Sequence, residues 1–183
     1  MDGLPIASIV AKLLYESSHA ALIGFSIATT NRRSKGGQFV LHAKALPGNP
    51  YDGHTLAVVI DTTEKLTGCA IERAYVDRGY RGHDTANPRR VFISGQKRGV
   101  FGVIKRELRR RSAIEPVIGH LKSDGHLGRC HLKGREGDAA NVLLTAVGHN
   151  LRLVLAWLRL LLPLILNALM RLLAAPAELK WVC

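Results

Sequence analysis

The sequence has 183 residues, enough for one domain of ordinary size, and 47% of them are apolar, which excludes a chain that is disordered throughout. Lysine and arginine number 26 against 14 aspartates and glutamates, giving a formal net charge of +12. This excess predicts a polyanionic partner, most simply nucleic acid, with an anionic membrane surface as the alternative. The three cysteines lie far apart and the first residues lack the basic segment of a secretory signal, so we expect a cytoplasmic protein.

The first twenty residues show only a weak pattern, and the sequence after them predicts a β-hairpin. Residues 6–14 are interpreted as a short helix within a divergent N-terminal segment, residues 1–20. The apolar run 22–28 is typical of a buried strand, and residues 38–43 are expected to pair with it. The polar, glycine-containing stretch 31–37 predicts the loop between these strands.

A helix and a central strand are predicted next. Asp52 stands where a capping residue is expected, before a helix over about residues 53–66, and Gly68 is a suitable residue to end that helix. The run 70–76 is apolar throughout most of its length, as in a central strand of a sheet, and it ends on Asp77.

The sequence of the second half of the chain predicts one short strand and two long helical stretches. Residues 91–94 form the strand, residues 100–122 form a basic helix with a kink near Arg111, and Asp138 is expected to cap a long helix. This order of elements predicts an α/β domain with a mixed sheet and flanking helices over residues 21–150. An apolar C-terminal helix and tail follow over residues 151–183.

Two acidic residues stand out as candidates for chemistry. Asp77 follows a buried strand and precedes a glycine-rich turn, the place where open α/β sheets carry their active sites, although aspartate is also a common turn residue. Glu115 lies 38 residues later within a stretch rich in arginine. It is either a salt-bridge partner of those arginines or a ligand of a divalent metal ion.

The positive charge is concentrated in one quarter of the chain. Residues 89–135 contain thirteen lysines and arginines against three acids, a net charge of +10. This segment is either a solvated basic face or a DNA-binding surface. A zinc site built from the histidines and cysteine of residues 120–131 is disfavoured, because their spacing matches no standard site.

Five ordered motifs resemble insertion-sequence transposases of the DDE type, closest to the insertion-sequence-five group of the insertion-sequence-four-like superfamily. They cover residues 46–56, 74–82, 111–122, 132–141 and 148–152. The superfamily signature Tyr-x2-Arg-x3-Glu-x6-Lys is matched by Arg111, Glu115 and Lys122, whereas Leu108 stands at the tyrosine position. The similarity extends from about Ile23 to Leu162.

The resemblance implies a ribonuclease H-like fold and DNA strand cleavage and transfer with two Mg²⁺ or Mn²⁺ ions. Asp77 and Glu115 would be the catalytic, metal-binding residues. The resemblance places further residues against DNA, and they are Tyr80, Arg81, Arg111, Lys122, Lys133 and Arg135. The expected partners are terminal-repeat and target DNA, together with a second copy of the chain or an intact transposase subunit.

One element of the family's pattern has no match in the sequence. The family carries its first catalytic aspartate on the first strand of the sheet, whereas before residue 24 this chain offers only Asp2 and Glu16 as acids. We therefore expect that the first strand is missing and that the chain is a truncated, inactive remnant that keeps DNA binding. The alternative is a noncatalytic DNA-binding fragment that interferes with an intact transposase.

The apolar C-terminal stretch resembles a membrane span in length. However, its polar residues fall within roughly a third of the helical circumference at 100° per residue. They are Arg152, Arg159, Pro163, Asn167 and Arg171. A narrow polar stripe of this kind favours packing against the core or a second subunit over insertion into a membrane.

Overall fold

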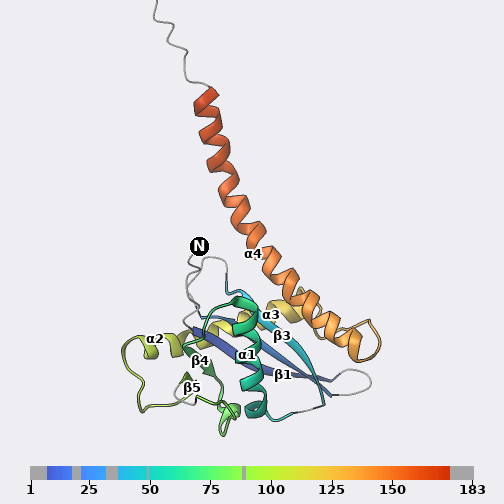
Figure 1. The fold of residues 1–183 in the computed structure, drawn as a ribbon. Helices are drawn as coiled ribbons and strands as arrows, with labels where there is room; N and C mark the ends of the chain where they lie inside the picture. Colours follow the sequence, from blue (N-terminus) through green and yellow to red (C-terminus); the bar gives the residue numbers. More distant parts are fainter. Residues whose placement is uncertain (1–7, 18–21, 32–36, 49, 88–89, 174–183) are drawn as a thin grey trace, which may run out of the picture.

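The computed structural model describes residues 8–17, 22–31, 37–48, 50–87 and 90–173. Five strands form one mixed sheet in the order β3-β2-β1-β4-β5 (Figure 1). They are β1 (Ser8–Ser17), β2 (Leu22–Thr30), β3 (Val40–Pro47), β4 (Arg73–Val76) and β5 (Val91–Ile93). The first three strands pair antiparallel, whereas β4 pairs parallel with β1, and β5 with β4. The sequence-based expectation of a mixed α/β sheet is confirmed.

The first strand is not missing, which corrects the expectation drawn from the sequence. Residues 8–17 form β1, the central strand of the sheet, and not the short helix expected over residues 6–14. Ile9, Val10 and Ala11 are all completely buried or nearly so. A central strand with both faces covered is apolar at consecutive positions, so it lacks the alternation that identifies a half-buried strand.

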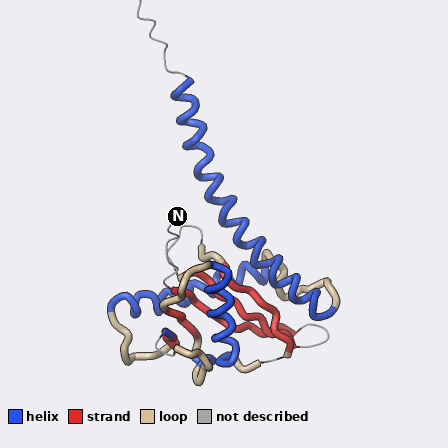
Figure 2. Tube along the Cα trace, in the orientation of Figure 1, coloured by secondary structure: helices blue, strands red, loops and turns tan. Residues whose placement is uncertain are grey.

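Two apolar cores lie on the two faces of the sheet. On one face Ile9 and Ala11 pack with Leu56 and Val59 of helix α1 (Leu56–Thr67). On the other face Val10 packs beneath the helices that follow β5. Figure 2 shows the helices on either side of the strands. The alternation of side chains along β1 therefore assigns each residue of that strand to one layer.

Helix α1 largely follows its prediction. Gly68 ends it in the left-handed conformation, with a φ of 66°, and its N–H is bonded to the carbonyl of Glu64. The expected cap at Asp52 is wrong, because Asp52 begins a turn of 3-10 helix, η1 (Asp52–Thr55), that precedes α1, and Thr55 is the N-cap residue of α1. Instead the hydroxyl of Thr55 donates to the backbone carbonyl of Asp52 at 2.8 Å.

The basic helical stretch is divided into three parts, which confirms the predicted kink. Helix α2 (Gly102–Arg110) leads through a 3-10 turn, η4 (Arg111–Ala113), into helix α3 (Ile114–Ser123). The buried residues of α3 anchor it to the sheet, and they are Ile114, Val117, Ile118 and Leu121. Their spacing at three and four residues gives α3 one apolar face.

The last helix, α4 (Gly134–Leu173), is a single element of 40 residues that begins four residues before the expected cap at Asp138. Its first half packs on the edge strand β3, and the last buried residue is Leu153. Beyond it, Trp157 meets Phe39 edge to face, with ring centroids 5.1 Å apart. Residues 158–173 are exposed and project away from the sheet (Figure 1), so they do not pack on the core as expected.

Candidate functional site

Lys12, midway along β1, lies beside Asp77, which directly follows the end of the parallel strand β4. Ala11 of β1 pairs with Val76 of β4, so the next residue on each strand lies beside the other. Val10 and Tyr75 pack in the same apolar core, and side chains two residues apart share a face. Lys12 and Asp77 therefore extend from the edge of that core on the same side of the sheet.

Glu115 reaches the same place from helix α3. Its neighbour Ile114 is completely buried, and the anchoring of Ile114 fixes the first turn of α3 over the sheet. Glu115 itself is half exposed, at 50% of its side chain. The site is therefore open to solvent on one side and closed by the sheet on the other.

The four charged side chains at this point form one cluster. The ammonium of Lys12 donates a hydrogen bond to Oε1 of Glu115 and lies 3.7 Å from Oδ2 of Asp77. The guanidinium of Arg111 donates to the other oxygen of Asp77. The two carboxylates thus converge on one point, and what lies between them is the lysine of the chain itself.

This cluster does not fit the metal site of a DDE enzyme. The transposase resemblance implies Mg²⁺, whose ligands are oxygen atoms of carboxylates, phosphates and water. A protonated lysine has three donors and no lone pair, so Lys12 cannot be a ligand. Within the described part of the chain, no group of three histidine, cysteine or acidic side chains is placed to hold a metal ion.

The remaining residues assigned to DNA by the resemblance lie in different surroundings. Tyr80 is completely buried in the α1-side core, so its side chain offers no surface to DNA in this conformation. Arg81, Lys122, Lys133 and Arg135 are exposed. Lys122 lies seven residues after Glu115, about two helical turns further along the same side of α3.

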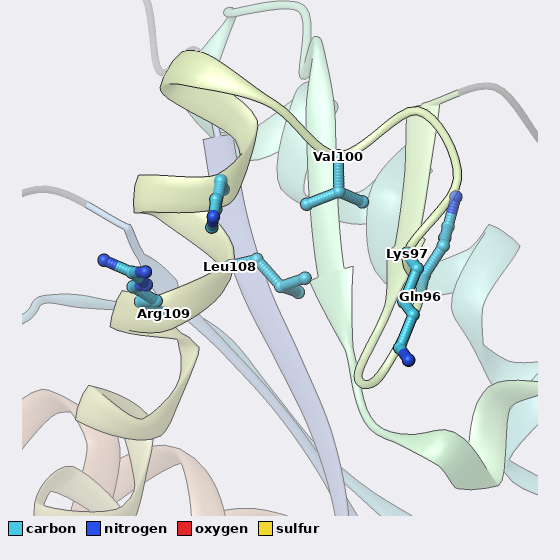
Figure 3. Close-up of a pocket in the computed structure, with 6 residues that line it drawn as sticks. Gln96, Lys97, Val100, Leu108 and Arg109 are labelled. Atoms are coloured by element: carbon cyan, nitrogen blue, oxygen red, sulfur yellow. The ribbon is translucent and has the colours of Figure 1, made fainter.

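Helix α2 carries a basic outer face. Lys105, Arg106 and Arg109 are exposed, while Ile104 and Leu108 pack against the core beneath them. A cavity of about 360 Å³ adjoins this face, between α2 and the loop after β5 (Figure 3). Its lining combines three cations with an amide and two apolar side chains, and consists of Gln96, Lys97, Val100, Lys105, Leu108 and Arg109.

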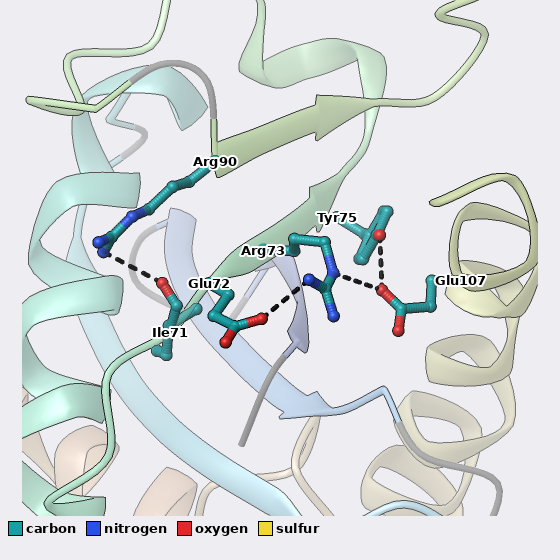
Figure 4. A network of polar contacts seen from close by, with 6 residues as sticks. All are labelled: Ile71, Glu72, Arg73, Tyr75, Arg90 and Glu107. Atoms are coloured by element: carbon teal, nitrogen blue, oxygen red, sulfur yellow. Dashed lines mark hydrogen bonds and ion pairs between the residues drawn. The ribbon is translucent and has the colours of Figure 1, made fainter. Parts of the chain in front are cut away.

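Glu107 holds this helix to the sheet through its inner side. Its Oε2 accepts hydrogen bonds from the hydroxyl of Tyr75 at 2.7 Å and from Nε of Arg73 at 2.9 Å (Figure 4). Burial, together with its hydrogen bond to Glu107, raises the pKa of the Tyr75 phenol, and the separate hydrogen bond from Arg73 to Glu107 raises the pKa of Arg73. This network fixes the orientation of α2, so that its arginines and lysines face solvent.

Sequence reasoning missed both Lys12 and Glu107. Lys12 follows the apolar run of residues 9–11, but the transposase resemblance implies an acid on the first strand, so a lysine there gave no functional signal. Glu107 is a single acid among the cations of α2. Its partners Arg73 and Tyr75 are more than thirty residues away in the sequence, so nothing local identifies it.

Comparison with protein families supports the resemblance over part of the chain. Residues 96–155, about a third of the sequence, match a family model described as a transposase DDE domain, a kind of domain that acts in DNA transposition. The match contains α2, Glu115 on α3, and the half of α4 that packs on the sheet. Asp77 and Lys12 lie outside it. Comparisons with curated proteins and with solved structures give no significant match.

Proposed function

We propose that this protein acts in DNA transposition as a DNA-binding domain of the DDE transposase type. The observation that carries the proposal is the convergence of Asp77, at the end of β4, and Glu115, within the stretch that matches the transposase domain. These two acids come from motifs 38 residues apart, and the fold brings both to one ammonium group. If residues 89–135 were only a solvated basic face, the two acids would have no reason to converge.

The arrangement of strands supports a ribonuclease H-like fold, while the insertion-sequence subgroup is proposed from the five motifs of the sequence alone. Three antiparallel strands are followed by two parallel ones, and β1 is the central strand. Asp77 follows the strand beside β1, and an acid-bearing helix covers the same end. This is the arrangement that the family resemblance implies for its catalytic face.

The basic face of α2 is the proposed contact with the DNA backbone. Lys105, Arg106 and Arg109 present three cations on one side of a helix whose other side is fixed by Glu107. The adjoining cavity adds Lys97 and the amide of Gln96. Cations and amide donors of this kind bind phosphate oxygens without reading base sequence, so we infer binding with little sequence preference.

The experiment combines a binding assay with a strand-transfer assay on the whole chain. Binding to duplex DNA should weaken steeply with salt, with little difference between terminal-repeat and unrelated DNA. Incubation with Mg²⁺ or Mn²⁺ and terminal-repeat DNA should yield no strand transfer, because Lys12 stands where a third acid would be needed. Absence of binding at low salt would contradict the DNA-binding role, and efficient joining would contradict the proposed inactivity.

A second candidate function rests on helix α4. Its exposed half, residues 158–173, is apolar and could join this chain to another subunit. On this hypothesis the chain binds terminal-repeat DNA together with an intact transposase and reduces its activity. Adding the purified chain to an active transposase of the same group, with an unrelated basic protein as the control, distinguishes a specific inhibitor from a simple competitor for DNA.

A further inference from the structure

We propose that Lys12 is a built-in counter-ion that takes the place of a divalent metal between Asp77 and Glu115. The ammonium donates to Glu115 and lies 3.7 Å from Asp77, so one cation of the chain contacts both acids. The inference concerns metal binding alone and stands or falls separately from the proposed role in DNA transposition.

The position of Lys12 is set by the backbone and not by chance contact of a flexible side chain. It lies on the central strand, one residue after the pair Ala11–Val76, and its side chain is 21% exposed. The two residues before it, Val10 and Ala11, are completely buried or nearly so. The backbone of Lys12 is therefore held by the packed strand beside Asp77. This position brings the ammonium group within reach of both carboxylates.

The charges of the cluster are already balanced without a metal ion. Lys12 and Arg111 supply two positive charges, and Asp77 and Glu115 supply two negative ones. A divalent ion at this place would have to displace the ammonium of Lys12 from both carboxylates and would then lie beside two cations. Like charges at such short range disfavour the bound ion, so the chain as it stands excludes Mg²⁺ and Mn²⁺ from this site.

Replacing the lysine by an acid should reverse this property. In Lys12→Asp the third carboxylate would extend from β1 beside Asp77, toward the side on which Glu115 lies. Three acids from β1, β4 and α3 would then form a site for a hard divalent cation. The Lys12→Met variant removes the charge and keeps an unbranched side chain of similar length, so it tests the loss of the counter-ion without adding a ligand.

The experiment measures Mn²⁺ binding directly, by the loss of the electron paramagnetic resonance signal of free Mn²⁺ on titration with protein. We expect no binding of Mn²⁺ at the cluster in the wild type. The affinity of Lys12→Asp for Mn²⁺ should exceed by at least about tenfold any residual affinity of the wild type, because affinity rises with the number of charged ligands. The matched control is Lys44→Asp, which makes the same charge change at an exposed position of β3. Lys12→Asp/Glu115→Gln should lose the added binding.

A thermal-unfolding measurement covers the case in which Lys12→Asp does not fold. Lys12→Met leaves two carboxylates without the ammonium, so its unfolding temperature should fall below that of the wild type, and Mn²⁺ should raise it again. The wild type should show no such response to Mn²⁺. The proposal is overturned if the wild type binds Mn²⁺ as tightly as Lys12→Asp, if Lys44→Asp gains as much, or if Mn²⁺ stabilises the wild type as much as Lys12→Met.

Discussion

Asn150 of helix α4 pairs with the backbone of Val40 on the edge strand β3 as another strand would. Its side-chain oxygen accepts a hydrogen bond from the N–H of Val40 at 2.9 Å, and its amide donates to the Val40 carbonyl at 2.8 Å. An exposed edge of a sheet presents unpaired backbone groups of this kind. The amide of Asn150 therefore closes part of the edge and fixes the position of α4 on the sheet.

Asn150→Leu should destabilise the folded chain by about 2–4 kcal/mol, because two backbone groups of Val40 lose their partners in a partly buried position. Chemical denaturation followed by circular dichroism measures the change. The matched control is Asn167→Leu, on the exposed half of the same helix. Leucine favours a helix more than asparagine does, so helix propensity gives no loss in either variant, and an equal loss in both would show that pairing with Val40 does not account for the effect.

Much of the sheet could be predicted from the sequence because its strands carry local signals. The hairpin β2–β3 is bounded by polar and glycine residues, and β4 is followed directly by Asp77 and a glycine-rich turn. Strand β1 could not be recognised in this way. It contains Ala11, Lys12 and leucines, residues that favour a helix in isolation, and only the burial of both its faces makes it a strand.

The candidate site was predicted in part. The acids Asp77 and Glu115 lie within motifs that can be recognised by spacing, and the structure brings them together. The partner of these acids could not be predicted, because Lys12 reaches them only through the parallel pairing of β1 with β4. The pairing is a long-range property of the sheet, and no pattern within residues 8–17 encodes it.

Glu107→Leu should cost about 2–4 kcal/mol of stability, because Arg73 and Tyr75 would both lose an acceptor in a partly buried network. Glu107 is only 12% exposed. Glu72 also pairs with Arg73 but is 59% exposed, so Glu72→Leu should cost less than about 1 kcal/mol. Denaturant unfolding of the two variants makes the comparison. Similar losses in both would contradict the structural role of Glu107.

Replacing cations of α2 should change the salt dependence of DNA binding in proportion to their number. Each lost phosphate contact should reduce the slope of log K against log salt by about 0.9. Lys105→Gln should therefore lower the slope by about one, and Lys105→Gln/Arg109→Gln by about two. Lys122→Gln should weaken binding uniformly across sequences. Fluorescence anisotropy at several salt concentrations measures these slopes.

The control for this prediction is Lys65→Gln, which removes an exposed cation from α1 on the opposite side of the sheet. It should leave the slope unchanged. If Lys65→Gln reduces the slope as much as Lys105→Gln, DNA binding follows the overall charge of the chain and is not localised on α2.

Acid should destabilise the fold partly through His42. Burial, with a smaller contribution from Lys44, lowers the pKa of His42 to about 4. Below about pH 6.5 the unfolded chain binds a proton at this residue that the folded chain does not, so stability falls as pH decreases from 6.5 toward 4. The loss at pH 4 should be on the order of 3 kcal/mol, since one pKa unit corresponds to ~1.4 kcal/mol.

The His42→Gln variant should be less sensitive to acid over this range, because it has no imidazole to protonate on unfolding. Unfolding free energies at several pH values give the dependence. His131→Gln is the matched control, since His131 is exposed in the loop between α3 and α4. The prediction fails if His42→Gln keeps the full pH dependence of the wild type.

The exposed half of α4 should cause self-association in the absence of lipid. Leu161 and Ile165 are 48% and 54% exposed, lie one turn apart on the helix and face away from the polar stripe. By length and apolar composition this helix could also cross a membrane. However, Arg159 lies well inside any span that begins near Asn150, and an arginine at the centre of a bilayer costs about 2.5–3.5 kcal/mol on insertion scales. Packing of the apolar side against a second copy leaves the stripe of Arg159 and Asn167 in water.

Sedimentation velocity should therefore show an associated wild type, and Leu161→Glu/Ile165→Glu should dissociate it, because two carboxylates on the apolar side cannot be buried without partners. Arg159→Glu/Asn167→Glu makes two substitutions to the same residue on the polar stripe and should leave the association intact. In a flotation assay, carbonate should release the wild type from vesicles. A wild type that stays with intact vesicles after carbonate, with one flank of α4 protected from protease, would instead be a spanning protein.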